Sequence, residues 1–351
     1  MIRKSKIWII SEFYFPMVTS TGYYITEIAE FIAKTNNVNV ITTDSIYNEK
    51  NKHTFIKNEY RNGVFIHRIK SIKLEKNSFF SRAIKLFMSS FQLFIKLLFS
   101  VRRNDQILIV TNPAFLILLM PVLKLFRKVK YKVLVHDVFP ENLAAIGKVN
   151  ATSLFYRFLK GVFDFAYSQA DVCIAIGRDM KSVLEKKNVN RSRIVVIPNW
   201  SDTDQVKPVN KIDTNLINKL NIKDKFIFQF AGNLGYAQGL DNIIEAIKLV
   251  TNEKIHFLFI GSGAMENKIK EFKNRNSLNN VTHIGFQNRN EQNDFLNACD
   301  VSLVTLSSGM LGLGVPSKSY NIMASGKPIL VIANIIPTYA AAVRRIHDSD
   351  K

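Results

Sequence analysis

Several residues near the C-terminal end of the chain have the types and spacing of an anion-binding loop. Residues 312–318 read Gly-Leu-Gly-Val-Pro-Ser-Lys and lead into a predicted helix from about Ser317 to Ser325. Pro316 suits a first helical turn, and the Ser317 hydroxyl can accept a hydrogen bond from a free amide. The positive helix end and the Lys318 ammonium favour an anion such as a phosphate. The alternative is an ordinary capped helix in a βαβ unit.

Two glycine-containing loops could bring backbone amides to the same kind of ligand. One follows the apolar run 226–231 and contains Gly232, Asn233, Gly235 and Gln238. The other contains Gly22, between a predicted strand at Ile7–Ile10 and a predicted amphipathic helix at 20–33. Because glycine lacks a Cβ, backbone N–H groups in such loops can approach a diphosphate closely.

A third group of polar residues follows the predicted strand Tyr131–Val135. It comprises His136, Asp137 and Glu141. Ligands of open α/β sheets bind beyond the carboxyl ends of the strands, so these side chains are candidate catalytic or acceptor-binding groups. The alternative is a structural histidine with two solvated carboxylates.

The elements that must position these residues alternate between apolar strands and helices. The pattern predicts two doubly wound α/β domains, residues 1–200 and 209–351, joined by a linker at 201–208, with a ligand cleft between them. Further strands are predicted at Val38–Thr42, Gln106–Val110, His256–Ile260 and Ile329–Ile332. A chain of 351 residues, 47% hydrophobic and 22% charged, is large enough for two cores. Cys173 and Cys299 are isolated thiols that indicate core packing in a reducing compartment.

The net charge of +20 is concentrated in the first domain. Residues 1–200 contain 31 Lys and Arg against 14 Asp and Glu, whereas residues 201–351 contain 17 against 14. The segment Phe79–Arg103 is rich in Phe and Leu, and residues 123–132 add a second basic and apolar cluster. The segment is either a core helix or a helix lying at an anionic membrane interface. Nucleic acid is not expected as a partner, because no recognition motif is present. No uninterrupted run reaches the length of a transmembrane helix.

Residues 315–328, Val-Pro-Ser-Lys-Ser-Tyr-Asn-Ile-Met-Ala-Ser-Gly-Lys-Pro, resemble the nucleotide-sugar segment of retaining family-4 glycosyltransferases of the GT-B fold. Further matches run from about residue 7 to 332, including Ile197-Pro198-Asn199. The resemblance is greatest to the L-fucosamine and N-acetylhexosamine transferases of surface-polysaccharide synthesis. It implies catalytic roles for His136 and Asp137, and an acceptor-cleft position for Glu141. The donor-binding residues that it implies are Gly22, Gly232, Asn233, Gly235, Gln238, Gly314, Val315, Pro316, Ser317, Lys318 and Asn321.

The chain departs from the family pattern at three places. Asn233 and Gln238 stand where many members carry Arg and Lys, and Leu313 and Asn321 stand where many carry glutamates. Asn321 can still bind a ribose hydroxyl, whereas the Leu313 side chain cannot. After Ile332 the resemblance stops, which leads us to expect a truncated second domain with an exposed sheet edge.

The resemblance implies a glycosyltransferase that transfers the sugar of a UDP-sugar donor to a lipid-linked saccharide acceptor. It would act at the inner face of the plasma membrane. No cofactor and no metal are expected, because no cluster of His, Cys, Asp and Glu has metal-ligand spacing. A GT-B epimerase acting on UDP-GlcNAc and a non-catalytic remnant that binds membrane or nucleic acid remain as alternatives.

Overall fold

The computed structural model describes residues 5–17, 19–44, 56–72, 79–276 and 278–333. It contains two compact units. The first is made of Met1–Pro198 together with Gly312–Val315, and the second of Asn199–Leu311 together with Pro316–Lys351. The division after Pro198 lies two residues before the end of the predicted first domain. The assignment of Gly312–Val315 differs from the prediction, which had these residues in the second domain.

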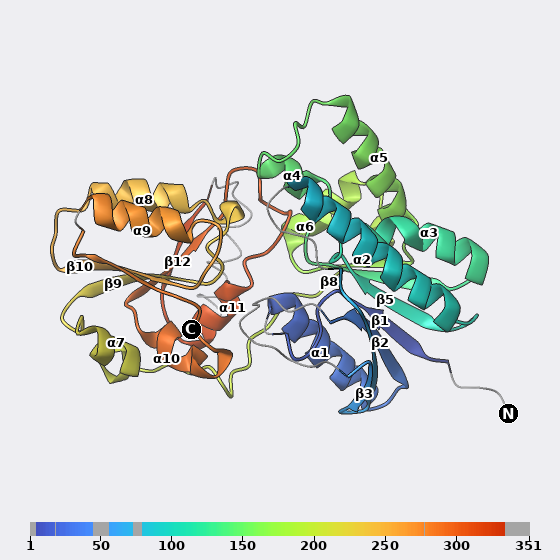
Figure 1. Ribbon diagram of the computed structural model, residues 1–351, viewed down its shortest axis with the longest axis horizontal. Coiled ribbons are helices and arrows are strands. Elements are labelled where there is room, and N and C mark those ends of the chain that lie inside the picture. The colour runs from blue at the N-terminus through green and yellow to red at the C-terminus, as the bar shows by residue number, and fades with distance from the viewer. Residues whose placement is uncertain (1–4, 18, 45–55, 73–78, 277, 334–351) are drawn as a thin grey trace. The chain divides into compact units, whose positions relative to one another are not determined.

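An eight-stranded sheet forms the centre of the first unit, in the order β3-β4-β2-β1-β5-β6-β7-β8 (Figure 1). Neighbouring strands are parallel except for the antiparallel pair β3 and β4. The strand order reverses between β1 and β5, and ligands of open α/β sheets bind at the carboxyl ends of strands beside such a point. The strands are β1 (Ile7–Ile10), β2 (Val38–Thr43), β3 (Asn58–Arg61), β4 (Val64–Ile69), β5 (Gln106–Val110), β6 (Lys130–Val135), β7 (Val172–Ala175) and β8 (Ile194–Val196).

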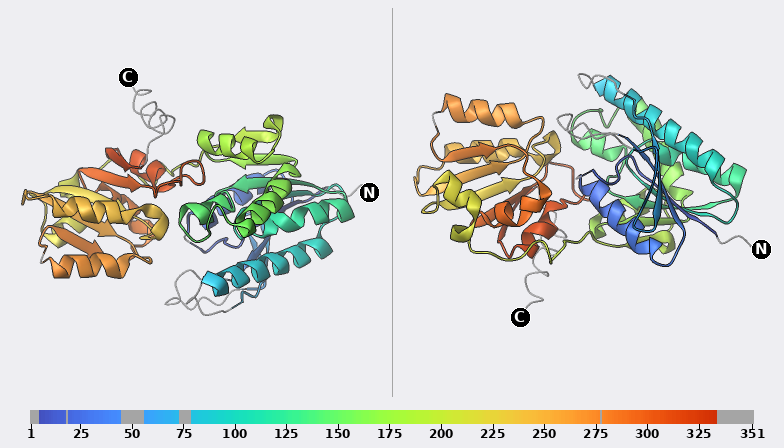
Figure 2. Two further views of the ribbon diagram at one scale, coloured as in Figure 1. Left: turned by 90° about the horizontal axis from the view of Figure 1, so that it is seen from above. Right: turned by 60° about the horizontal axis from the view of Figure 1, so that its bottom comes forward.

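Six α-helices accompany this sheet within the described residues, and three of them, α2, α3 and α5, pack side by side (Figures 1 and 2). The aromatic segment predicted from residue 79 forms α2, whose Leu93, Phe94 and Leu97 are buried, whereas Phe87 and Phe99 are exposed. The helix is therefore amphipathic. The helices are α1 (Ser20–Ala33), α2 (Phe79–Ser100), α3 (Leu116–Arg127), α4 (Glu141–Ala145), α5 (Leu154–Ser168) and α6 (Arg178–Lys186).

Helix α2 is also long and apolar enough to cross a membrane by length and composition. The 18-residue window Ala83–Ser100 has a mean hydropathy of 1.4, and 28% of it is buried. A core helix of a soluble protein can satisfy the same criterion. Because its buried face packs on β2 and α3, we interpret α2 as part of the layer that covers the sheet.

The second unit has a five-stranded parallel sheet in the order β11-β10-β9-β12-β13. This order reverses between β9 and β12, as in a doubly wound fold. The edge strand β13 pairs with β12, and the sequence after Ile332 lies almost wholly outside the described residues. The strands are β9 (Phe226–Ala231), β10 (Ile255–Ile260), β11 (Val281–Ile284), β12 (Val301–Thr305) and β13 (Ile329–Ile332). The helices are α7 (Asn215–Leu220), α8 (Leu240–Lys248), α9 (Glu266–Arg275), α10 (Gln292–Asn297) and α11 (Lys318–Ala324).

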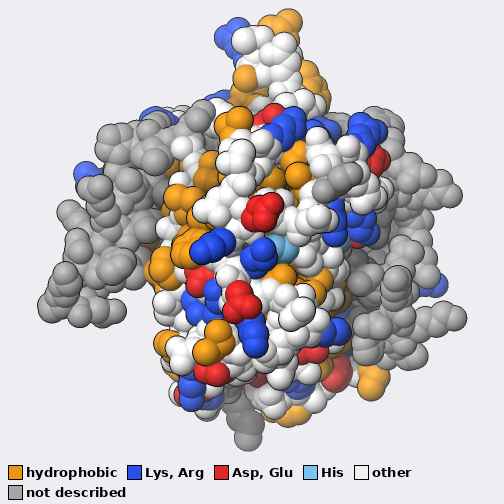
Figure 3. Space-filling view, turned by 90° about the vertical axis from the view of Figure 1, so that its left-hand side faces the viewer, with side chains coloured by type: hydrophobic (Ala, Val, Ile, Leu, Met, Phe, Trp, Pro, Cys, Tyr) orange, Lys and Arg blue, Asp and Glu red, His pale blue; other side chains and the backbone are white. Residues whose placement is uncertain are grey.

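Short 3₁₀ turns complete the secondary structure, at η1 (Arg191–Arg193), η2 (Lys211–Asp213), η3 (Tyr236–Gln238) and η4 (Arg289–Glu291). Figure 3, which faces the second unit, shows Lys and Arg side chains intermingled with Asp and Glu. This agrees with the near balance of charge in residues 201–351 and leaves the first unit as the basic one.

Candidate functional site

The predicted anion-binding lysine occupies an unusual environment in the second unit. Lys318 begins α11, and its Nζ lies 3.3 Å from the centroid of the Phe230 ring on β9. The Nζ is buried and makes no hydrogen bond with any residue that the structure describes. Burial lowers the pKa of Lys318 to about 7. A buried ammonium held only by an aromatic face is costly, and an anionic ligand would supply the missing partner.

The glycine loop after β9 adjoins this lysine. Gly232 has φ 139°, and a Cβ placed on it would lie 3.6 Å from the Lys318 Nζ. A Cβ on Gly261 would come within 2.0 Å of the Gly232 carbonyl oxygen, so the loops after β9 and β10 pack backbone against backbone. Gly232 thus allows a close approach to Lys318, and Gly261 allows a close approach to Gly232. Both glycines lie beside the point where the strand order reverses.

The other residues of the second unit that were predicted to bind the sugar donor differ in their surroundings. The Asn233 side chain lies against Gly235, and the backbone carbonyl oxygen of Gln238 accepts a hydrogen bond from the Thr305 hydroxyl. The Asn321 Oδ1 accepts a hydrogen bond from the Ser201 hydroxyl at 2.7 Å, which leaves its amide N–H groups for a ligand. Ser317 directly precedes α11, and its hydroxyl makes no capping bond, so that part of the prediction is wrong. Pro316 is buried beside it.

Gly22 is less available to a ligand than its sequence context suggests. Its N–H donates to the Thr19 hydroxyl, which caps α1. A Cβ at this position would lie 2.8 Å from the Met17 carbonyl oxygen. The structure therefore gives this glycine a packing and capping role within the first unit.

In the first unit, the polar residues after β6 form a compact hydrogen-bonded group. The backbone N–H groups of His136 and Asp137 both donate to the Thr111 hydroxyl, at 3.1 Å each. The His136 Nδ1 lies 3.2 Å from the Thr21 hydroxyl, and its buried Nε2 has no hydrogen-bond partner among the described residues. Burial lowers the pKa of His136 to about 4, so the imidazole is neutral near pH 7. It therefore offers one free ring nitrogen for a substrate hydroxyl.

Asp137 is held beside the segment Gly312–Val315, which explains why this segment belongs to the first unit. Asp137 and Gly314 form an antiparallel bridge, and the Val138 N–H donates to the Leu313 carbonyl oxygen at 2.8 Å. A Cβ on Gly314 would lie 3.3 Å from the Asp137 Oδ1, and the Val315 side chain crowds Gly177. Burial raises the pKa of Asp137 to about 6. Gly314 thus contacts the predicted catalytic residue Asp137, whereas Val315 packs against Gly177.

Glu141 is not a free carboxylate. Both of its oxygens lie 2.7 Å from the Lys187 Nζ, and one lies 3.4 Å from the Lys160 Nζ. Lys187 also pairs with Asp164 at 2.6 Å and is completely buried. This four-residue ion-pair cluster, formed by Glu141, Lys160, Asp164 and Lys187, anchors the start of α4. Sequence reasoning missed Lys187, because nothing in its local sequence distinguishes it from a surface lysine.

Comparison with known proteins assigns both parts of the chain. Residues 21–205 match the family model described as Glycosyltransferase Family 4, and residues 213–344 match the model described as Glycosyl transferases group 1. The chain belongs to glycosyltransferase family 4. This family assignment agrees with the resemblance seen in residues 315–328 and with the two Rossmann-like units of the GT-B fold. The second match continues to residue 344, so the prediction that the resemblance stops after Ile332 is wrong.

The matches between this family-4 protein and individual relatives cover only part of each relative. It is 43% identical over 257 residues to WbjE of Pseudomonas aeruginosa, named as a probable glycosyltransferase, and the match covers 73% of this chain and 64% of that relative. It is 29% identical over 160 residues to WcaI of Escherichia coli (strain K12), named as a candidate glycosyl transferase of colanic acid biosynthesis. That match covers 45% of this chain and 39% of WcaI. Both matches span less than two thirds of the relative.

A solved structure supports the fold independently of sequence. The crystal structure of Anabaena HepE in complex with UDP and glucose has a TM-score of 0.68 at 14% identity, covering 93% of this chain and 80% of that chain. At this identity the likeness concerns the fold alone. Among the residues that the structure describes, no group of three or more His, Cys, Asp and Glu could hold a metal ion.

Proposed function

We propose that this family-4 protein transfers a sugar from a nucleotide-diphosphate donor, of the UDP-N-acetylhexosamine type, to a lipid-linked saccharide. The observation that carries the proposal is the buried Lys318 ammonium beside the Gly232 loop, which has no hydrogen-bond partner among the described residues. A donor diphosphate supplies the anion that this site lacks. HepE, which shares the fold, binds UDP and glucose, and WcaI is named for colanic acid biosynthesis. These names favour the assembly of capsule, O-antigen or exopolysaccharide as the setting.

The proposed reaction breaks the bond between the anomeric carbon and the diphosphate oxygen, and the bonding electrons stay with the diphosphate. The acceptor hydroxyl oxygen forms the new bond, and its proton passes to the leaving diphosphate. Retention at the anomeric carbon is implied by the family. In this scheme Lys318 and backbone amides stabilise the developing phosphate charge, and the neutral His136 holds a sugar hydroxyl. The protein's contribution is mainly electrostatic and positional.

The function is tested by incubating the purified protein with a panel of UDP-sugars and a lipid-linked saccharide while UDP release is measured. A transferase releases UDP only when donor and acceptor are both present. A GT-B epimerase would instead produce an epimerised UDP-sugar without acceptor. A non-catalytic lipid-binding protein would bind vesicles but leave every UDP-sugar unchanged.

Replacing His136 with alanine is expected to lower turnover by about 100-fold or more, because a positioned hydrogen-bonding group is lost at the reacting sugar. Folding stability should fall by only about 1–3 kcal/mol, as for other buried truncations. The matched control is His256→Ala, which removes another buried histidine, bonded to the Thr282 hydroxyl at 2.9 Å in β10. Equal losses of turnover in the two variants, corrected for the folded fraction, would make His136 purely structural.

We further propose that the basic first unit attaches to an anionic membrane surface through α2, α3 and the start of β6. Exposed apolar side chains on α2 and α3 include Phe87, Phe99, Leu125 and Phe126. Arg127, Lys128 and Lys130 are exposed next to them, whereas Lys124 is bound to Asp171 at 2.9 Å and is not available to lipid. Cations and apolar side chains together are the composition of a peripheral membrane surface.

Changing Arg127, Lys128 and Lys130 to Gln is expected to weaken binding to anionic vesicles by about 100-fold, since each cation contributes about 1 kcal/mol near such a surface. Binding of the parent protein should fall with rising salt but not vanish, because the apolar contacts are insensitive to screening. The control changes Lys268, Lys270 and Lys273 of the second unit to Gln and removes the same charge. Co-sedimentation measures both variants. If both lose binding equally, net charge and not this surface is responsible.

A further inference from the structure

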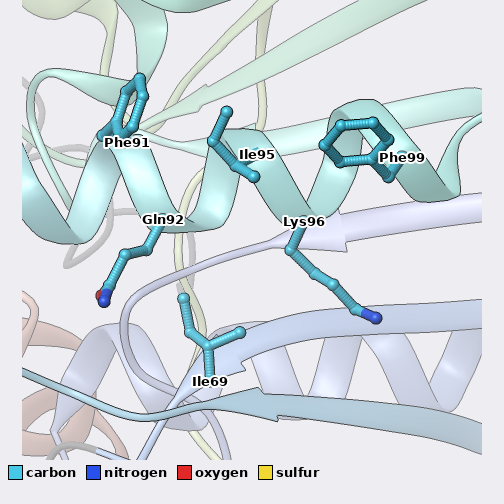
Figure 4. Close-up of a pocket in the computed structure, with 6 residues that line it drawn as sticks. All are labelled: Ile69, Phe91, Gln92, Ile95, Lys96 and Phe99. Atoms are coloured by element: carbon cyan, nitrogen blue, oxygen red, sulfur yellow. The ribbon is translucent and has the colours of Figure 1, made fainter.

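A groove on the first unit runs along α2 beside the end of β4. It has a volume of about 430 Å³ and is lined by Ile69, Phe91, Gln92, Ile95, Lys96 and Phe99. Figure 4 shows Gln92 and Lys96 extending from α2 toward the side on which Ile69 lies. This volume falls in the range of about 300–1,000 Å³ that is usual for small-molecule sites. The groove is separate from the residues assigned above to donor binding and catalysis.

The shape of the groove suits an extended hydrocarbon chain. Phe91, Ile95 and Phe99 are spaced four residues apart, so they follow one face of α2 over about 12 Å. Phe91 is 43% exposed and Phe99 is 77% exposed. Apolar side chains left open to water along such a strip gain free energy when an aliphatic chain covers them. A compact polar ligand would leave most of this wall uncovered.

Two polar groups at the groove indicate which headgroup the bound hydrocarbon chain should carry. Lys96 is exposed and forms no ion pair with any residue in the described ranges. The Gln92 Oε1 is buried and accepts no hydrogen bond there. The Lys96 ammonium can pair with a phosphate, and the Gln92 Oε1 can accept a hydrogen bond from a hydroxyl. Together they match a phosphate that carries a hydroxylated group. Phe91 and Phe99 also belong to the exposed face of α2, so the groove is continuous with the proposed membrane surface.

We propose that this groove binds one molecule of phosphatidylglycerol from the bilayer. One acyl chain lies along Phe91, Ile95 and Phe99, the phosphate pairs with Lys96, and a glycerol hydroxyl donates to Gln92. The proposal rests on the proposed membrane attachment but concerns a single lipid. It can therefore be tested without a bilayer, a sugar donor or an acceptor, and its failure would leave the proposed transferase activity untouched.

The test uses dioctanoyl phosphatidylglycerol, below its micelle-forming concentration, with binding to the whole protein measured by calorimetry. Saturable one-to-one binding is expected. Ile95→Trp, which fills the groove, should weaken it at least tenfold. The surface variant Lys96→Gln should weaken it several-fold and abolish any preference over dioctanoyl phosphatidylcholine. The control Phe126→Ser, on α3 outside the groove, should leave the affinity for the monomeric lipid unchanged.

The proposal is overturned if the lipid does not saturate, or if Ile95→Trp binds it as the parent does. Equal affinity of the parent for dioctanoyl phosphatidylcholine would also overturn it, because Lys96 would then not recognise the headgroup. If farnesyl phosphate binds more tightly and displaces phosphatidylglycerol, the groove takes a single-chain isoprenoid and the assignment to a bilayer lipid is wrong.

Discussion

Replacing Lys318 with methionine is expected to weaken UDP-sugar binding by about 10- to 150-fold, the equivalent of a hydrogen bond to a charged group. The same change should stabilise the ligand-free protein by about 1–3 kcal/mol, because it removes a buried ammonium that no anion pairs with in the described part of the chain. Calorimetry with UDP-sugar and denaturant unfolding measure the two effects. Few substitutions raise stability while they lower affinity, so this combination identifies a residue kept for its ligand.

The pH dependence of Lys318 follows from the direction of its shift. Burial lowers its pKa from the usual lysine value of 10.5 to about 7. Between these values the unfolded lysine holds a proton that the folded one releases, so the stability of the free protein should rise with pH across this window. Donor affinity should fall over the same range, because the neutral amine no longer attracts the diphosphate. Both dependences should disappear in Lys318→Met.

Lys327→Met is the matched control for both measurements. Lys327 lies on the same segment of the second unit, and its Nζ donates to the Val209 carbonyl oxygen at 3.1 Å. Its replacement should cost stability, because a satisfied interaction is lost, and leave donor affinity unchanged. If Lys318→Met bound the donor as tightly as the parent, in a protein that binds the donor at all, the diphosphate would not lie at Lys318.

The second large effect is expected at Lys187. Changing it to methionine should lower the free energy of unfolding by about 3–5 kcal/mol, because Glu141 and Asp164 would lose their buried counter-ion. Lys160→Met, which removes a partly exposed member of the same cluster, should cost about 1 kcal/mol or less. Chemical denaturation compares the two.

A double variant shows whether the ion pair itself is responsible. Adding Glu141→Gln to Lys187→Met should recover part of the loss, since one unpaired carboxylate is removed. Additive losses would contradict the cluster described here and return Glu141 to the acceptor-binding role that the sequence indicated.

Much of the fold could be predicted because the strands are continuous and apolar. Helix α1 was predicted at Ser20–Ala33 and β13 at Ile329–Ile332, as observed. The hairpin of β3 and β4 was missed although its turn, Asn62-Gly63, is a strong hairpin signal and both residues have positive φ. Helix α5 was missed as well, although the Ser153 hydroxyl caps it by accepting from the Tyr156 N–H.

The site was harder to predict, because its decisive contacts join residues distant in sequence. Lys318 stood out by its local motif, but its place over the Phe230 ring depends on how β9 packs. The bridge between Asp137 and Gly314 joins a strand end to a loop that the motif alone assigned to the donor. From the sequence, the carboxylate of Glu141 is free to bind an acceptor. In the structure it is paired with Lys187, 46 positions away. The chemical type of each side chain follows from the local sequence, whereas the residues that it contacts are known only from the tertiary structure.

The most direct test of the proposed reaction is the transfer of labelled sugar to lipid. Purified protein is incubated with a radiolabelled UDP-N-acetylhexosamine and a lipid-linked saccharide, and the organic phase is extracted and counted. We expect label in the lipid fraction, matched by an equal amount of released UDP and greatly reduced in Lys318→Met at limiting donor. If UDP-sugars across the panel remained intact, or the label stayed in water as an epimerised nucleotide sugar, the proposed transfer reaction would be wrong.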